Sequence, residues 1–138
     1  MTVVGDGSAP HAMPAHVQAV ATISGPTDLV RLGNPFVSSL LGGPPQERAD
    51  LARLASPLTF ITPARPLPPF LIMHGTRDDQ VPFHQAVLLY DALTGAGADV
   101  TLVPVEAGHN LLGSHDKETY EAVLLRFFHK RLYGACVM

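Results

Sequence analysis

Hydrophobic residues are concentrated in three short runs, and each run is bounded by turn-forming residues. The runs cover residues 17–23 (VQAVATI), 70–73 (FLIM) and 100–105 (VTLVPV). The first run stops at the sequence SGP and the second at HG. Apolar runs of this length, bounded by glycine and proline, favour buried β-strands over helices. Pro104, inside the third run, predicts that this strand lies at an edge of its sheet or leaves the pairing early.

Two segments after the second run have helical periodicity. Residues 82–94 begin with Pro82, in the favoured first-turn position, and are followed by Gly95 and Gly97, which favour a helix end. Residues 120–131 carry an apolar stripe with basic residues in the last turn, where the helix dipole favours positive charge. The sequence therefore predicts a helix after the second strand and another after the third.

The segment between the first two strands is less regular. Residues 28–45 are weakly helical because glycine and proline interrupt them, and residues 46–54 predict one short helix. Residues 56–69 contain several prolines and predict a rigid, solvent-facing connector. We interpret residues 28–66 as cap-like helices and connector, and residues 1–16 as an irregular lead-in.

Strands that alternate with helices predict right-handed crossovers and a parallel sheet. We therefore expect an α/β fold, with three parallel strands flanked by helices on both faces. Residues 17–138 are long enough for one domain with a core of its own.

Composition excludes several classes of function. The formal net charge is -3 and there is no run of lysine or arginine, so no nucleic-acid or anionic-membrane partner is expected. No apolar stretch approaches the length of a membrane span. The single cysteine, Cys136, and the absence of a leader-like N-terminus predict a cytoplasmic protein. The seven histidines lack metal-ligand spacing and there is no nucleotide-binding glycine motif, so neither a metal nor a cofactor is expected.

Candidate chemistry lies in the loops that follow the second and third strands. Asp78 follows the second strand and His109 the third, and the carboxyl ends of neighbouring parallel strands meet at one edge of the sheet. Each residue has an ordinary structural role available, Asp78 as a helix cap and His109 as a turn histidine. Together they fit better as the acid and base of a catalytic triad, in which the carboxylate fixes the imidazole tautomer.

The segment from HGTRDDQVP to EAGHN resembles the C-terminal catalytic segment of α/β-hydrolase-fold carboxylesterases, in the branch that holds feruloyl esterases, hormone-sensitive-lipase-like esterases and prolyl-oligopeptidase-like peptidases. The resemblance implies a partial α/β-hydrolase fold, a small ester as substrate, Asp78 as the triad acid and His109 as the triad base. Asp79 falls on a variable position of that pattern and is given no catalytic role.

The sequence departs from this family at the nucleophile. It contains no G-x-S-x-G elbow, and the nearest serine, Ser8, has Asp6 and Pro10 where the motif has glycine. Ser24, at the end of the first strand, is the best internal substitute, although a small residue is also needed at that turn. Ser114 is better explained as a helix cap.

Substrate-contacting residues are expected in the cap-like segment. Phe36, Leu40 and Leu41 are candidates for an acyl pocket, and they are equally suited to a core.

Two functions remain open from the sequence. The first is a carboxylic ester hydrolase that is weak, or that depends on a substitute nucleophile or on a second chain. The second is a catalytically inactive, truncated hydrolase that acts as an oligomeric binding or structural module. An unpaired edge of the first strand would favour a homo-oligomer, formed by strand pairing or swapping.

Overall fold

The computed structural model describes residues 16–111 and 117–134, and it has the α/β architecture expected from the sequence. Three parallel strands form one sheet in the order β1 (Val20–Ile23), β2 (Phe70–Gly75) and β3 (Val100–Val105). The central strand β2 is almost completely buried, as a continuous apolar run predicts for a parallel strand covered on both faces.

The strand ends differ from the predicted ones. β1 begins at Val20 rather than Val17, whose side chain is 57% exposed. β2 continues two residues past Met73, because His74 pairs with Pro104 and Gly75 with Val105. The edge position predicted for the proline-containing third strand is confirmed in the described sheet.

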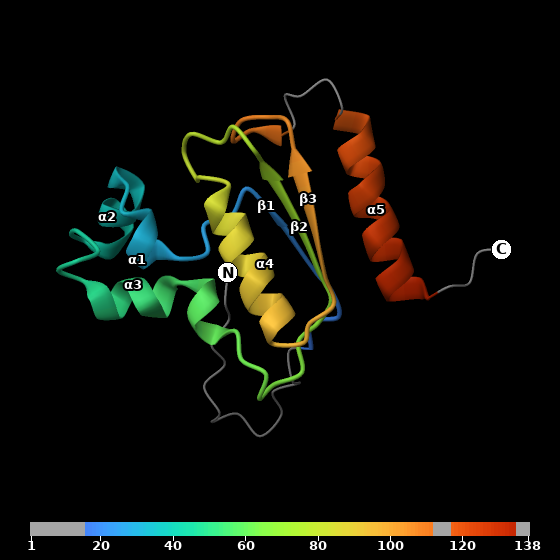
Figure 1. Ribbon diagram of the computed structural model, residues 1–138, viewed down its shortest axis with the longest axis horizontal. Helices are drawn as coiled ribbons and strands as arrows, with labels where there is room; N and C mark the ends of the chain where they lie inside the picture. Colours follow the sequence, from blue (N-terminus) through green and yellow to red (C-terminus); the bar gives the residue numbers. More distant parts are fainter. Residues whose placement is uncertain (1–15, 112–116, 135–138) are drawn as a thin grey trace.

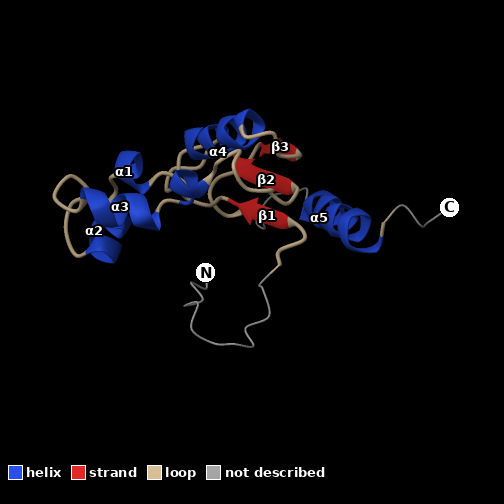
Figure 2. Cartoon of the chain, turned by 90° about the horizontal axis from the view of Figure 1, so that it is seen from below, coloured by secondary structure: helices blue, strands red, loops and turns tan. Residues whose placement is uncertain are grey.

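The two long helices cover opposite faces of the sheet (Figures 1 and 2). Helix α4 (His84–Gly95) packs Ala86, Leu89 and Leu93 against Ile72 of β2. Helix α5 (Lys117–Tyr133) packs on Leu71 and Met73, which point to the other face because side chains alternate along a strand. The prediction of helices on both faces is confirmed.

The segment between β1 and β2 folds into a small helical group that lies off to one side of the sheet, beyond α4 (Figure 1). Its elements are α1 (Leu29–Leu32), α2 (Pro35–Leu41), α3 (Ala49–Ala55) and the 3₁₀ turn η1 (Pro57–Phe60). Leu29, Val37, Leu41 and Ala52 form its own core. Gly33, with φ of +53°, ends α1 as the sequence suggested.

The prediction of a solvent-facing connector over residues 56–69 is wrong in part. Ser56 is buried, and its hydroxyl donates to the carbonyl of Ala52 at 2.6 Å and accepts from the Leu29 amide at 2.9 Å. Ile61 and Leu67 pack against the α4 side of the sheet. Apolar side chains within the proline-rich segment therefore turn inward, a detail that its composition did not reveal.

None of the helices in the described ranges is long and apolar enough to cross a membrane.

Candidate active site

The loops after β2 and β3 are joined backbone to backbone at the carboxyl edge of the sheet. The Thr76 amide donates to the Val105 carbonyl at 2.8 Å, and the Arg77 amide donates to the Ala107 carbonyl at 3.0 Å. Gly75 permits this approach, because a Cβ there would collide with the backbone carbonyl of Gly108. The two loops are thus held together immediately before the residues that carry the chemistry.

Asp78 is buried in this junction and uses both carboxylate oxygens. Oδ1 accepts from the backbone amides of Gln80 at 3.0 Å and Val81 at 2.8 Å, while Oδ2 accepts from His109 Nδ1 at 2.8 Å. The carboxylate therefore caps its own turn and also holds the imidazole. It does not cap the following helix α4, whose N-cap residue, Phe83, has no side-chain capping bond.

The environment of Asp78 favours its ionised form. Burial by itself raises the pKa of the carboxyl, but the hydrogen bonds from Val81, His109 and Gln80 outweigh burial and leave the pKa below its ordinary value of 3.8. An ionised Asp78 accepts a hydrogen bond from the Nδ1–H group of His109 and leaves Nε2 free to take a proton from another group.

A second imidazole also reaches this carboxylate. His74, at the end of β2, is 1% exposed, and its Nε2 lies 2.7 Å from the Val81 carbonyl and 3.3 Å from Asp78 Oδ2. Because a carbonyl can only accept, Nε2 of His74 carries a hydrogen. The HG sequence marks the end of the strand but gives no sign that its histidine contacts the acid.

A cavity of about 380 Å³ opens next to His109. Ser24, Phe36 and Leu40 line this cavity, whereas Leu41 is buried in the helical group. The other lining residues share no motif that a sequence would reveal: Ile23, Gly25, Pro26, Leu29, Leu32, Asn34, Val37, Gln80 and Val81. Asp79, which was given no catalytic role, is exposed.

Ser24 has an unusual backbone for a serine. It follows β1 with φ of +51°, a left-handed conformation that L-residues seldom adopt, and its amide donates to the Met73 carbonyl at 3.0 Å. Its hydroxyl is buried and has no hydrogen-bond partner among the described residues, His109 included. Ser8 and Ser114 lie outside the described residues.

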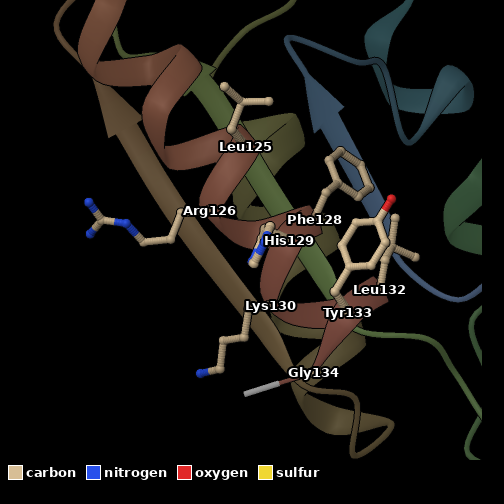
Figure 3. Close-up of a pocket in the computed structure, with 8 residues that line it drawn as sticks. All are labelled: Leu125, Arg126, Phe128, His129, Lys130, Leu132, Tyr133 and Gly134. Carbon is tan, nitrogen blue, oxygen red and sulfur yellow. The ribbon is translucent and has the colours of Figure 1, made fainter. Parts of the chain in front are cut away.

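A larger hollow lies elsewhere, on the outer side of α5 (Figure 3). Its volume is about 820 Å³, and it is lined by Leu125, Arg126, Phe128, His129, Lys130, Leu132, Tyr133 and Gly134. None of these residues belongs to the junction of Asp78 and His109, so size alone does not identify the candidate active site. Among the described residues no group of three potential metal ligands is present.

One family model and several solved structures are similar to this chain. Residues 5–93 match the family model described as BD-FAE. A truncated form of a carbohydrate esterase from gut microbiota is 28% identical, with a TM-score of 0.66, over 81% of this chain and 42% of that chain. The esterase Est2 from the Planctomycetes species Thermogutta terrifontis is 26% identical, with a TM-score of 0.69, over 96% of this chain and 49% of that chain.

A curated relative is similar over a shorter stretch. It is a 5-methylorsellinic acid synthase of Aspergillus terreus, 37% identical over 62 residues, which are 45% of this chain and 2% of that protein. This chain therefore spans less than half the length of each of these three relatives.

Proposed function

The chain belongs to the BD-FAE family of esterase-like α/β-hydrolases, and we propose that it acts in the hydrolysis of small carboxylic esters, with Asp78 as acid and His109 as base. The observation that carries the proposal is the 2.8 Å hydrogen bond between His109 Nδ1 and Asp78 Oδ2 at the carboxyl edge of the sheet. In such a pair the carboxylate orients the imidazole and stabilises the imidazolium that forms when Nε2 takes the proton of a nucleophile.

The nucleophile proposed within the chain is Ser24. Two features support it: Ser24 lines the same cavity as His109, and its left-handed backbone at the end of a parallel strand is the kind of strained strand-to-helix turn that exposes a serine nucleophile. The hydroxyl of Ser24 is buried and makes no hydrogen bond to His109 in this conformation, so attack requires it to come within hydrogen-bond reach of the imidazole. A serine supplied by a second chain is the other source considered.

The proposed substrate is a small ester with an apolar acyl group. Phe36 and Leu40 expose 72% and 70% of their surface beside the cavity, and an ordered apolar group placed there would cover them. Leu41 is proposed to support this wall from the core of the helical group rather than to touch the substrate. The similar Thermogutta terrifontis esterase 2 is known in a form phosphonylated by sarin.

Labelling with a fluorophosphonate, followed by peptide mass spectrometry, tests the nucleophile. We expect an adduct on Ser24 that is absent in Ser24→Ala and forms more slowly in His109→Ala, because the imidazole activates the hydroxyl. Ser38→Ala, in α2 of the helical group, is the matched control, and this variant should be labelled as the wild type is. An adduct on any other serine would rule Ser24 out.

The second candidate function is an inactive, oligomeric binding or structural module formed by two or more copies. It is supported by the edge of β1 opposite β2, which pairs with no strand in the described residues. It is also supported by apolar side chains on the outer side of α5, where Leu125 and Tyr133 are 71% and 74% exposed (Figure 3). This function predicts a stable dimer with no ester turnover.

A further inference from the structure

The candidate cavity is built from two separate parts of the fold. Leu29, Leu32, Phe36 and Leu40 come from the helical group, whereas Val81 and His109 come from the loops at the sheet edge. The helical group has its own core and stands apart from the sheet (Figures 1 and 2). The width of the cavity therefore depends on the contacts that join the group to the sheet.

One buried side chain makes most of the polar contacts at this joint. Gln85, in the first turn of α4, is 4% exposed, and its Oε1 accepts from the backbone amides of Thr27 at 2.9 Å and Asp28 at 2.7 Å. Its Nε2 donates to the Asp28 carbonyl at 3.3 Å. The Thr27 hydroxyl donates to the Gln85 carbonyl at 2.7 Å. A neutral amide that carries both an acceptor and a donor suits this site, because a buried backbone amide without a partner is costly.

The contacts continue from this joint to both sides of the cavity. Asp28 also caps α1, since its Oδ1 accepts from the amides of Val30 and Arg31 at 3.1 Å each, and α1 carries Leu29 and Leu32. On the other side, Gln85 lies four residues after Val81, whose amide binds Asp78. A further polar link across the cavity is the solvent-exposed hydrogen bond, 3.1 Å long, that Asn34 Nδ2 donates to the Gln80 carbonyl.

We propose that Gln85 is a positioning residue that fixes the α1–α2 wall of the cavity in register with the Asp78–His109 pair. It does not touch the reacting atoms. Its amide holds the start of the helical group against the first turn of α4, so that Phe36 and Leu40 face His109 across a cavity of defined width. That the wall binds substrate rests on the proposed ester hydrolysis. That Gln85 holds the wall in place does not.

Amide hydrogen exchange on Gln85→Met tests the proposal without any requirement for activity. Methionine keeps the length of the side chain and removes both polar atoms. We expect the amides of Thr27 and Asp28 to exchange at least about tenfold faster, while those of β2 keep their wild-type rates. Gln46→Met makes the same chemical change at an exposed glutamine of the helical segment and should leave all these rates unchanged.

Steady-state kinetics of Gln85→Met distinguish a residue that positions the cavity wall from one that only stabilises the fold. With p-nitrophenyl butyrate as substrate, Gln85→Met should raise KM by about tenfold and change kcat by less than about threefold, because the wall binds the acyl group and the acid–base pair is untouched. If the wild type shows no turnover, the proposed function fails, and the hydrogen-exchange result still shows whether Gln85 holds the wall in place.

Two results would overturn the inference. Unchanged exchange at Thr27 and Asp28 in Gln85→Met would show that the amide does not hold the wall. Equal acceleration in β2 would show that Gln85 serves overall stability and no particular wall. If Gln85→Met does not fold, Thr27→Val replaces it, since loss of one hydroxyl should accelerate exchange at the same place by a smaller factor.

Discussion

Asp78 accepts three hydrogen bonds, and a second imidazole lies 3.3 Å from its carboxylate, although its side chain is fully buried. Two backbone amides bind one oxygen, and two imidazoles approach the other. A buried carboxylate without partners would become protonated, whereas this one is stabilised as the anion. The turn that Asp78 caps is therefore also the device that keeps it charged beside His109.

Replacing Asp78 by asparagine tests its role in orienting the base. An asparagine can present its amide nitrogen to His109 and favour the wrong imidazole tautomer, so ester turnover should fall by a factor on the order of 10⁴. Asp79→Asn makes the same change at the exposed neighbour and should leave turnover within about twofold of the wild type. The measurement is kcat/KM for p-nitrophenyl acetate, and equal losses in the two variants would contradict the assignment.

The lowered pKa of Asp78 predicts a pH-dependent stability. A carboxyl with a lower pKa in the folded state contributes stability that is fully present above its unfolded value of about 3.8 and is lost as the pH falls through the folded value. The stability difference between the wild type and Asp78→Asn should therefore be constant above about pH 5 and shrink in acid. Urea midpoints measured across this range provide the check. A stability difference that grows as the pH falls would mean that the pKa of Asp78 is raised in the folded state, and would contradict the prediction.

At this scale the sequence predicted that Asp78 and His109 lie together, because both follow consecutive apolar runs and the ends of parallel strands converge. It did not predict the contact of His74 with Asp78 or the contacts of Gln85. These contacts depend on how segments that are distant in the sequence pack together, and a single histidine or glutamine carries no periodic signal.

At the scale of elements, the approach of the β3 loop to β2 depends on Gly75. A methyl group there meets the carbonyl of Gly108, and the backbone atoms that it strikes cannot rotate away. We expect Gly75→Ala to lower the free energy of unfolding by about 1–3 kcal/mol and to separate His109 from Asp78, with loss of turnover.

Gly95→Ala is the matched control for this prediction. Nothing lies within 4 Å of a Cβ at Gly95, which ends α4, so alanine there should be neutral or stabilising by up to about 1 kcal/mol. Thermal or urea unfolding distinguishes the two variants. Equal stability of Gly75→Ala and the wild type would mean that the loops are not held as closely as described.

The elements themselves were largely predictable. Strands β2 and β3 and helix α4 follow from strong periodic patterns and their glycine and proline boundaries. The sequence predicts a start of β1 at Val17, because valine suits a strand by residue type, yet pairing with β2 begins only at Val20. The connector over residues 56–69 was misjudged because proline content indicates stiffness and does not indicate which side chains are buried.

In the whole molecule, the edge of β1 that no strand of residues 16–111 and 117–134 covers predicts self-association. The amides of Val20 and Ser24 bond to the β2 side, so by alternation the amide of Ala21 points to the open edge. Ala21→Pro should therefore leave the sheet folded and block strand addition from another copy. We expect light scattering to show a dimer for the wild type and a monomer for Ala21→Pro.

Thr22→Pro is the control for Ala21→Pro. The same alternation directs the Thr22 amide towards β2, so this variant should lose stability whatever the oligomeric state. A wild type that is monomeric at high concentration would rule out association through β1 and weaken the case for a structural module.

The layered arrangement was predictable from the order of strands and helices, because right-handed crossovers leave few ways to place them. The separate position of the helical group was not. Its weak periodicity predicted helices and an acyl pocket, but the placement of Phe36 and Leu40 opposite His109 depends on the joint at Gln85. Leu41 is buried in the group's own core, which the sequence did not distinguish from a pocket.

If His109, held by Asp78, is the base for ester hydrolysis, its removal must abolish most of the turnover of p-nitrophenyl butyrate. We predict a loss of at least about 10³-fold in kcat relative to the wild type, while His84→Ala, at an exposed histidine of α4, retains full activity. Turnover by the purified wild type that is unchanged in His109→Ala would contradict the account.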